Sequence, residues 1–264
     1  MRAAARCVLT AAMLVSVLPP RPAVAAGPQS PRLPVRVVAV HPHDPRAFTQ
    51  GLVYHAGKLY ESTGQLGVSR LREVEPATGK VLREVALGPR EFGEGLALVG
   101  ERLFQITWQN GLAHVWRLGD FASLGSLRYE GEGWGLTFDG ESLVQSDGSD
   151  QLTFRSPRDF SAGRTLRVTR DGAAVAYLNE LEFAAGAIYA NVWMSDEIVR
   201  IDPASGRVTA TYEATGLLAP DEAARADVLN GIAWNPARQV FYLTGKWWPS
   251  LFEVELPAPA VPVR

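Results

Sequence analysis

The stretch EFGEGLALVGERLFQITWQ, Glu91 to Gln109, sets a pattern that the rest of the chain repeats. Within it, Leu96 follows a glycine, and a second apolar run opens seven residues later at Leu103. The same frame occurs five times, and its anchoring apolar residues are Leu52, Leu96, Leu136, Leu181 and Ile232. These anchors are 44, 40, 45 and 51 residues apart, which is the period of a propeller blade and is too long for most solenoid repeats.

Each repeat carries the signals of four short strands. An apolar strand leads into a tight turn, a second strand follows, and two more alternating strands come after a polar bend. The first turns are Ala56-Gly57, Val99-Gly100, Asp139-Gly140 and Ala185-Gly186, which favour β-hairpins. The sequence therefore predicts an all-β fold, a five-bladed β-propeller with four-stranded antiparallel blades.

The two ends of the repeat region supply the strands that close the ring. Val35 to Val40 precedes the first repeat, and Leu251 to Leu256 follows the last one. Because neither segment has a repeat of its own, we expect them to share the fifth blade. We expect a short helix within Pro220 to Asp227, in the longest interval between anchors. Residues 27–34 read as a linker and residues 35–264 as the propeller catalytic domain.

The amino terminus has the pattern of a cleaved secretory signal. Arg2 and Arg6 precede an apolar run from Cys7 to Leu18, and small residues follow at Ala23 to Ala26. We expect residues 1–26 to be a signal peptide and the mature protein to be secreted or periplasmic, without membrane attachment. Since Cys7 is the single cysteine, the mature chain would have no disulfide and no thiolate nucleophile. Cleavage would leave 23 basic against 28 acidic residues, a formal charge of −5, which argues against a nucleic-acid partner.

Equivalent positions of the repeats hold unlike residues. Two residues before the anchors stand Gln50, Glu94, Trp134, Asn179 and Asn230. Twelve residues after them, allowing for one longer turn, stand Gly64, Trp108, Gly148, Trp193 and Gly245, the last beside Lys246. A propeller gathers equivalent positions into a circle, so these slots predict aromatic walls with a few converging polar groups. That composition is typical of a small-molecule pocket.

Each of these residues also has a purely structural interpretation. Tryptophans often pack between blades, as we expect for Trp116 and Trp234, while Trp247 and Trp248 are undecided. Glu94 between two glycines has the setting of a solvated turn residue, and asparagines at strand ends often bond backbone groups. We expect His41 and His43 to be surface loop residues and not metal ligands, because two prolines flank them and no third ligand is near.

Nine sequence blocks resemble the plant and bacterial type of glutaminyl-peptide cyclotransferase, also called glutaminyl cyclase. They are FTQGL (Phe48 to Leu52), FGEGL (Phe92 to Leu96), ITWQ (Ile106 to Gln109), EGWGLT (Glu132 to Thr137), SDGS (Ser146 to Ser149), LNELE (Leu178 to Glu182), YANVW (Tyr189 to Trp193), LNGIAW (Leu229 to Trp234) and LTGKWWP (Leu243 to Pro249). The resemblance covers Val35 to Leu256 with the blocks in the family's order. That family is a five-bladed β-propeller, in agreement with the blade count from spacing.

The resemblance implies an acyltransferase of the aminoacyltransferase class. Its substrates would be peptides or proteins with N-terminal Gln, which it would convert to pyroglutamate (5-oxoproline) and ammonia. The family's catalytic glutamate falls on Glu94. Its substrate-binding positions fall on Phe48, Gln50, Phe92, Trp108, Trp134, Asn179, Trp193 and Lys246. The resemblance also implies a structural calcium ion in the central channel, whose ligands the sequence does not assign, and no cofactor for catalysis; we expect a monomer.

The chemistry of cyclisation suits such residues, although two other functions stay open. The enzyme must hold the α-amine against the γ-carboxamide carbon and move a proton from one nitrogen to the other. One carboxylate whose pKa is raised by surrounding indoles could do both transfers. A metal-dependent propeller hydrolase or lactonase could instead use Glu94, Asn179 and Asn230 as ligands. A noncatalytic peptide-binding propeller would need no ionisable group at Glu94.

Overall fold

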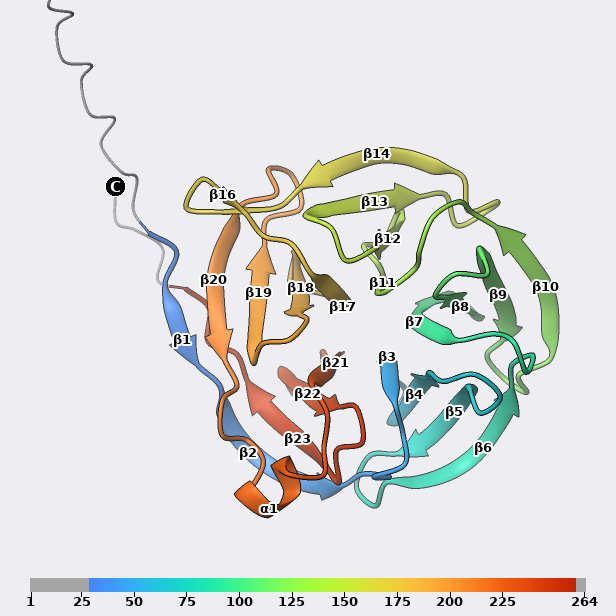
Figure 1. Ribbon diagram of the computed structural model, residues 1–264, viewed down its shortest axis with the longest axis horizontal. Helices are drawn as coiled ribbons and strands as arrows, with labels where there is room; N and C mark the ends of the chain where they lie inside the picture. The colour runs from blue at the N-terminus through green and yellow to red at the C-terminus, as the bar shows by residue number, and fades with distance from the viewer. Residues whose placement is uncertain (1–28, 260–264) are drawn as a thin grey trace, which may run out of the picture.

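The computed structural model describes residues 29–259. Five β-sheets form a ring around a central axis, and the first strand of each repeat lies nearest the axis (Figure 1). The predicted five-bladed, all-β propeller is therefore confirmed. The predicted signal peptide, residues 1–26 with Cys7, lies outside the described residues. Within the described range, no helix is long and apolar enough to cross a membrane.

Blades 1 to 3 follow the chain in order, and each is a four-stranded antiparallel sheet. Blade 1 contains β3 (Thr49–His55), β4 (Lys58–Thr63), β5 (Arg70–Glu75) and β6 (Lys80–Ala86). Blade 2 contains β7 (Gly93–Val99), β8 (Arg102–Thr107), β9 (Leu112–Arg117) and β10 (Ser123–Arg128). Blade 3 contains β11 (Leu136–Phe138), β12 (Leu143–Ser146), β13 (Gln151–Arg155) and β14 (Ala162–Arg167).

Blades 4 and 5 each incorporate a strand from the amino-terminal part of the chain. Blade 4 contains β17 (Leu178–Ala184), β18 (Ala187–Val192), β19 (Glu197–Ile201) and β20 (Val208–Glu213). β1 (Arg32–Pro34), within the segment expected as a linker, pairs in parallel with β20. Blade 5 contains β21 (Leu229–Asn235), β22 (Val240–Gly245) and β23 (Ser250–Glu255), and β2 (Arg36–Pro42) is its outermost strand. A two-stranded ribbon, β15 (Thr169–Arg170) and β16 (Ala173–Ala174), follows blade 3.

The ring closes as the sequence predicts. β2 pairs antiparallel with β23, from Arg36 opposite Glu255 to Pro42 opposite Ser250. The strand before the first repeat and the last strand of blade 5 thus share one sheet. The expected helix is also present as α1 (Pro220–Ala223), in the connection before β21.

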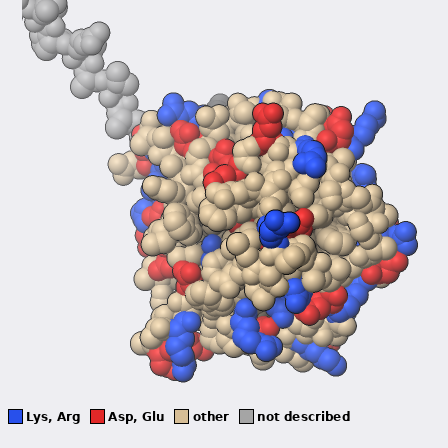
Figure 2. Space-filling model, turned by 45° about the vertical axis from the view of Figure 1, so that its right-hand side comes forward, with Lys and Arg blue, Asp and Glu red and all other residues tan. Residues whose placement is uncertain are grey.

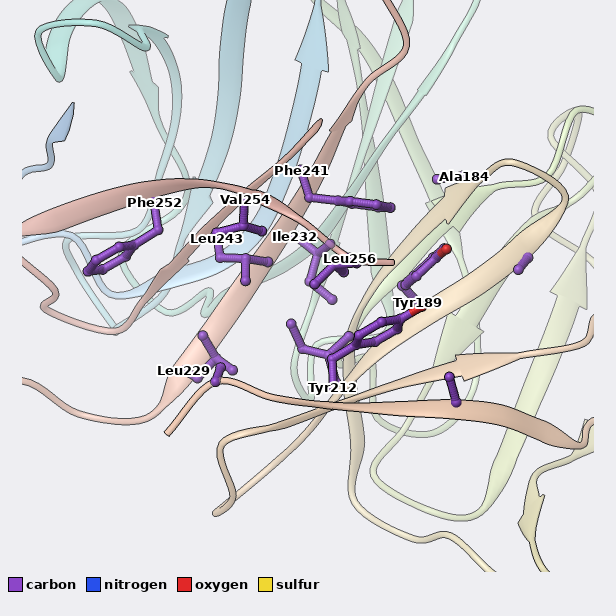
Figure 3. Packing of buried hydrophobic residues seen from close by; sticks show 14 of the residues in the cluster. Ala184, Tyr189, Tyr212, Leu229, Ile232, Phe241, Leu243, Phe252, Val254 and Leu256 are labelled. Carbon is purple, nitrogen blue, oxygen red and sulfur yellow. The ribbon is translucent and has the colours of Figure 1, made fainter. Parts of the chain in front are cut away.

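Apolar side chains between neighbouring blades form the core. Between blades 4 and 5, Tyr189 and Tyr212 face Phe241, Leu243 and their neighbours (Figure 3). The five anchoring residues of the repeats are all buried. Full burial of such an apolar side chain contributes about 1.5–3 kcal/mol to the stability of the fold. The repeated apolar positions in the sequence are therefore the positions at which each blade packs against the next. Acidic and basic side chains are interspersed on the face shown in Figure 2.

Glycine lets the inner strands approach one another closely. The residue just before the anchor is glycine in four blades, and a Cβ at Gly51 or Gly95 would collide with the backbone of the next blade. Blade 4 has Glu180 at this position. Its carboxylate is fully buried, and it accepts the backbone N–H of Leu52 in β3 at 3.1 Å and of Ile232 in β21 at 2.8 Å. Glu180 therefore fastens blade 4 to blades 1 and 5.

Candidate active site

Backbone irregularities place the polar side chains that the repeat analysis singled out. The pairing register of the first two strands shifts at the residues just before the anchor in blades 1, 2, 4 and 5. A β-bulge leaves an extra residue unpaired and redirects its side chain. The redirected residues include Gln50, Glu94, Asn179 and Asn230. Their common position in the frame therefore has a common backbone cause.

Glu94 lies at the start of β7, where it is only 5% exposed. Its carboxylate accepts a hydrogen bond from Gln50 Nε2 at 2.9 Å. Gln50 is held in turn, because its Oε1 accepts a hydrogen bond from Asn230 Nδ2 at 3.0 Å. Burial raises the pKa of Glu94 well above its ordinary value; Lys246 opposes this shift, and the negative charge of Glu132 adds to it.

Lys246 is the positively charged side chain that interacts electrostatically with the Glu94 carboxylate. It follows β22, is 6% exposed, and its Nζ lies 4.8 Å from the centroid of the Phe48 ring. Burial lowers the pKa of Lys246, while the charges of Glu94 and Asp227 act in the opposite direction. An ammonium beside an aromatic face and a carboxylate can stabilise negative charge that develops on a bound molecule.

Aromatic rings form one arc along blades 5, 1 and 2. Trp247 packs on Phe48 with ring centroids 5.0 Å apart, Phe48 packs on Phe92 at 5.9 Å, and Phe92 packs on Trp108 at 5.8 Å. All three contacts are edge-to-face, the arrangement that the charge distribution of aromatic rings favours. Trp108 remains 38% exposed and marks the rim.

A second aromatic arc belongs to blades 3 and 4. Trp134 packs edge-to-face on Trp193 with centroids 5.5 Å apart, and Trp193 contacts Tyr177 at 5.9 Å. Trp134 and Trp193 are half-buried, and Tyr177 is exposed. Tyr177 also has a φ of 64°, a strained backbone conformation that often occurs at functional sites.

Asn179 supplies an amide from blade 4. It is 3% exposed, and its Oδ1 has no hydrogen-bond partner among the described residues. Asn230 Oδ1 shares this property. Buried amide oxygens are nearly always hydrogen-bonded in folded proteins. The two amide oxygens therefore have unused hydrogen-bonding capacity among the described residues.

The structure links most of the residues singled out from sequence to one another. The structure joins Gln50 to Glu94 by a hydrogen bond and places Lys246 against Phe48. It places the remaining aromatic candidates in the two arcs, with Phe92 and Trp108 in the first arc and Trp134 and Trp193 in the second. Asn179 occupies the equivalent bulge of blade 4, and its Oδ1 has no hydrogen-bond partner among the described residues.

Three residues of the site were missed or left undecided from sequence. Trp247 joins the first arc, whereas its neighbour Trp248 is buried in the core between blades 4 and 5. Tyr177 and Glu132 were not singled out. A signal for them exists, because the positions four residues before the anchors hold Phe48, Phe92, Glu132, Tyr177 and Val228. This third circle of equivalent positions is mainly aromatic.

The expectation that both histidines are surface loop residues was wrong. His41 lies in strand β2, where its Nε2 is 3.4 Å from Glu253 Oε2. His43 was expected on a surface loop, but its side chain is buried and contacts Glu61 Oε1 at 3.0 Å and the Trp248 carbonyl oxygen at 2.8 Å. The pKa of His43 is raised even though burial opposes the charged form, because Glu61 attracts the proton. A buried carboxylate partner that is distant in sequence, and so invisible in a local pattern, explains the error.

The described residues contain no cluster of carboxylates that would mark the expected calcium ion. Calcium takes six to eight oxygen ligands, usually including carboxylates. Within residues 29–259, no group of three or more His, Cys, Asp and Glu side chains converges as a metal site would require. Glu180 is central, but both of its oxygens accept backbone N–H groups. We therefore assign no residue to the calcium ion that the resemblance implies.

A cleft adjoins the site on blade 1. It has a volume of about 290 Å³ and shares Phe48 and Gly64 with the site. Gly64 is required there, because a Cβ would collide with the Phe92 ring and approach Gln50. Asp44, Arg46, Arg70, Arg72 and Glu84 contribute charged side chains to its walls. The cleft provides room for chain that continues beyond a ligand held by the aromatic arcs.

Comparisons with known proteins agree with this geometry. The family model for glutamine cyclotransferase matches residues 8–256. A glutaminyl-peptide cyclotransferase from Arabidopsis thaliana is 40% identical over 228 residues, which is 84% of this chain and 71% of that protein. The crystal structure of Myxococcus xanthus glutaminyl cyclase matches with a TM-score of 0.80 and 40% identity, covering 88% of this chain and all of the other. The β-propeller domain of Myceliophteria thermophila Cps50 (Swd1), 10% identical with a TM-score of 0.52, shares the fold alone.

Proposed function

The chain belongs to the glutamine cyclotransferase family and acts as a glutaminyl-peptide cyclotransferase, and we propose that Glu94 is the general acid and base of its reaction. The observation that supports this proposal is the burial, raised pKa and incomplete hydrogen bonding of the Glu94 carboxylate. Glu94 is buried beside an aromatic arc, has a raised pKa, and accepts one side-chain hydrogen bond, from Gln50. Lone pairs of the carboxylate are therefore free to bind a substrate proton.

The reaction needs a proton to move between two nitrogens of one residue. The α-amine nitrogen attacks the γ-carboxamide carbon, forming the new ring bond, and the bond from that carbon to the amide nitrogen then breaks. Glu94 takes a proton from the attacking amine and returns it to the departing nitrogen, which leaves as ammonia. A raised pKa suits a group that must both accept and release a proton near neutral pH.

Other side chains are assigned the tasks of holding and stabilising. Indoles of the two arcs would enforce the compact conformer in which amine and carboxamide meet, which lowers the entropic barrier of ring closure. The ammonium of Lys246 and the amide of Asn179 would bind the carboxamide oxygen as negative charge develops on it. Gln50 holds the Glu94 carboxylate in place. The acid-base steps in this scheme use groups of the chain and of the substrate alone.

The substrates are peptides or proteins that begin with glutamine. The cleft beside Phe48 offers a path for the residues that follow the glutamine. We further propose that the protein is exported and cleaved, because residues 1–26 have the pattern of a cleaved signal, and that it acts as a monomer. The mass of the mature protein from its native host tests this, since an intact Met1 would contradict export with cleavage.

Incubation of purified protein with the dipeptide Gln-Ala tests the function. We expect ammonia and 5-oxoprolyl-alanine in equal amounts. The matched substrate N-acetyl-Gln-Ala should give neither, because its blocked amine cannot attack. An excess of chelator should leave the rate unchanged. A rate abolished by chelation and restored by a divalent metal would favour the metal-dependent alternative, and no turnover of Gln-Ala would favour a binding module.

A further inference from the structure

Glu132 lies at the junction of the two aromatic arcs. It belongs to the connection between β10 and β11, and its Oε2 accepts hydrogen bonds from Trp108 Nε1 at 2.7 Å and Trp134 Nε1 at 3.0 Å. Its Oε1 accepts a third bond from Gln109 Nε2 at 2.8 Å. One carboxylate therefore receives the indole N–H groups of two different blades.

These bonds restrain side chains that the fold itself restrains weakly. Trp108 belongs to the connection between β8 and β9 and is 38% exposed, and Trp134 precedes β11 and is half-buried. Within each arc the aromatic rings pack on one another, whereas Glu132 connects Trp108 of the first arc to Trp134 of the second. Hydrogen bonds to an ionised acceptor are about twice as strong as neutral ones. Glu132 thus makes the two arcs a single enclosure.

We propose that Glu132 is a positioning residue of the cyclisation reaction, which clamps the indoles of Trp108 and Trp134 and acts through its charge on Glu94. The inference rests on the proposed function of Glu94. Glu132 has two separable tasks. Holding the two indoles depends on the length of its side chain, and raising the pKa of Glu94 depends on its negative charge.

The charge acts on a small set of groups around Glu94. Lys246 faces Glu94 from the end of β22, Gln50 from β3, and Glu132 from the connection before β11. Tyr129 from the same connection also senses Glu94, and Asp227 acts on Lys246. Burial makes the largest contribution to the raised pKa of Glu94, and Glu132 is the charged side chain that adds to it. The pKa of Glu132 itself is lowered by its three hydrogen-bond donors, so it stays ionised.

Two variants separate the tasks. Glu132→Gln keeps the size of the side chain but removes the charge. Its amide NH₂ group replaces one of the two carboxylate oxygens, so at least one of the N–H donors from Trp108, Trp134 and Gln109 loses its acceptor. Glu132→Asp keeps the charge but withdraws the carboxylate by one methylene. Both should raise KM for Gln-Ala and lower kcat/KM about 10-fold or more, because charge-assisted bonds to the indoles are lost. Only Glu132→Gln should move the acid limb of kcat/KM to lower pH, since it lowers the pKa of Glu94.

Glu130→Gln is the matched control. Glu130 lies on the same connection and is exposed, so its replacement removes one negative charge without touching an indole, and kinetics should match the wild type. Indole N–H resonances of ¹⁵N-tryptophan-labelled protein supply a readout independent of turnover. In both Glu132 variants, two of these resonances should shift and their N–H groups should exchange faster with solvent.

The outcomes distinguish this inference from the proposed function. Unchanged indole resonances, or an acid limb and KM in Glu132→Gln that equal those of Glu130→Gln, would overturn the inference while leaving Glu94 as the acid-base group. If the wild-type protein does not cyclise Gln-Ala, the proposed function fails and the role in the reaction fails with it. The resonance shifts would in that case report the clamp as a structural feature alone.

Discussion

Glu94 and Glu180 are buried carboxylates of two neighbouring regions of the propeller, the aromatic site and the axis. Burial raises the pKa of both well above the ordinary value for glutamate. Their hydrogen bonds differ. Glu94 accepts one side-chain bond, from Gln50, whereas each oxygen of Glu180 accepts a backbone N–H from another blade.

The difference teaches that a raised pKa alone does not identify an acid-base catalyst. The oxygens of Glu180 are committed to Leu52 and Ile232, and its side chain is fully buried, so it is suited to fastening blades. Glu94 keeps lone pairs for a substrate and lies beside Lys246 and the aromatic arcs. The same side chain thus serves assembly in one region and chemistry in the other, according to what already occupies its oxygens.

Replacement of Glu94 by glutamine should have the largest effect. Glu94→Gln keeps size and polarity but cannot exchange a proton, so kcat for Gln-Ala should fall by at least about 100-fold. The melting temperature and the affinity for substrate should change little. An ammonia-release assay and a thermal melt check both. Near-normal turnover would make Glu94 a turn residue and would leave the aromatic site without the proposed mechanism.

The adjacent pair Trp247 and Trp248 sharpens the comparison between site and core. Trp248 is 4% exposed in the core between blades 4 and 5 and packs on Phe252, so Trp248→Ala should lower the free energy of unfolding by about 3–5 kcal/mol. Trp247 packs on Phe48, so Trp247→Ala should mainly raise KM. Urea denaturation and steady-state kinetics measure the two effects. Equal destabilisation by both variants would place Trp247 in the core as well.

Glu180→Gln should have a smaller effect, on stability alone. The amide NH₂ cannot accept the second backbone N–H, and an unsatisfied buried donor costs about 1–3 kcal/mol. The turnover per folded molecule should equal that of the wild type, in contrast to the identical substitution at Glu94. A loss of turnover at unchanged stability would show that Glu180 belongs to the reaction.

The repeat could be read from sequence because its anchors do the same work in every blade. Leu52, Leu96 and their equivalents are buried between blades at similar intervals, so spacing alone predicted the number of blades. The ring closure was predicted from the two terminal segments that have no repeat of their own. Glu94 and Gln50 were also recognisable, since each stands two residues before an anchor. A regular backbone thus makes both the core and part of the site visible as a period.

The rest depends on tertiary contacts that no local pattern contains. Glu132 accepts a hydrogen bond from Trp108 of another blade. Glu180 accepts hydrogen bonds from Leu52, which is 128 positions away in the sequence, and from Ile232, which is 52 positions away. Trp247 packs on Phe48 and Trp248 lies in the core, and Trp247 adopts a φ of 59° that residue type does not predict. β1 pairs with β20 although only three residues take part.

The pH dependence of kcat/KM for Gln-Ala tests the central claim most directly. Because the pKa of Glu94 is raised, the carboxylate that accepts the proton forms only as the pH rises past that raised value. The rate should therefore decline on the acid side at a pH above the ordinary glutamate value of about 4.3. The α-ammonium of Gln-Ala adds an ionisation of its own, at about 7.7–8.0, because only the neutral amine can attack. We predict that Glu180→Gln keeps both ionisations and that the residual rate of Glu94→Gln keeps only that of the substrate amine. An enzyme ionisation that persists on the acid side in Glu94→Gln, beyond that of the amine titrated in free Gln-Ala, would contradict the account.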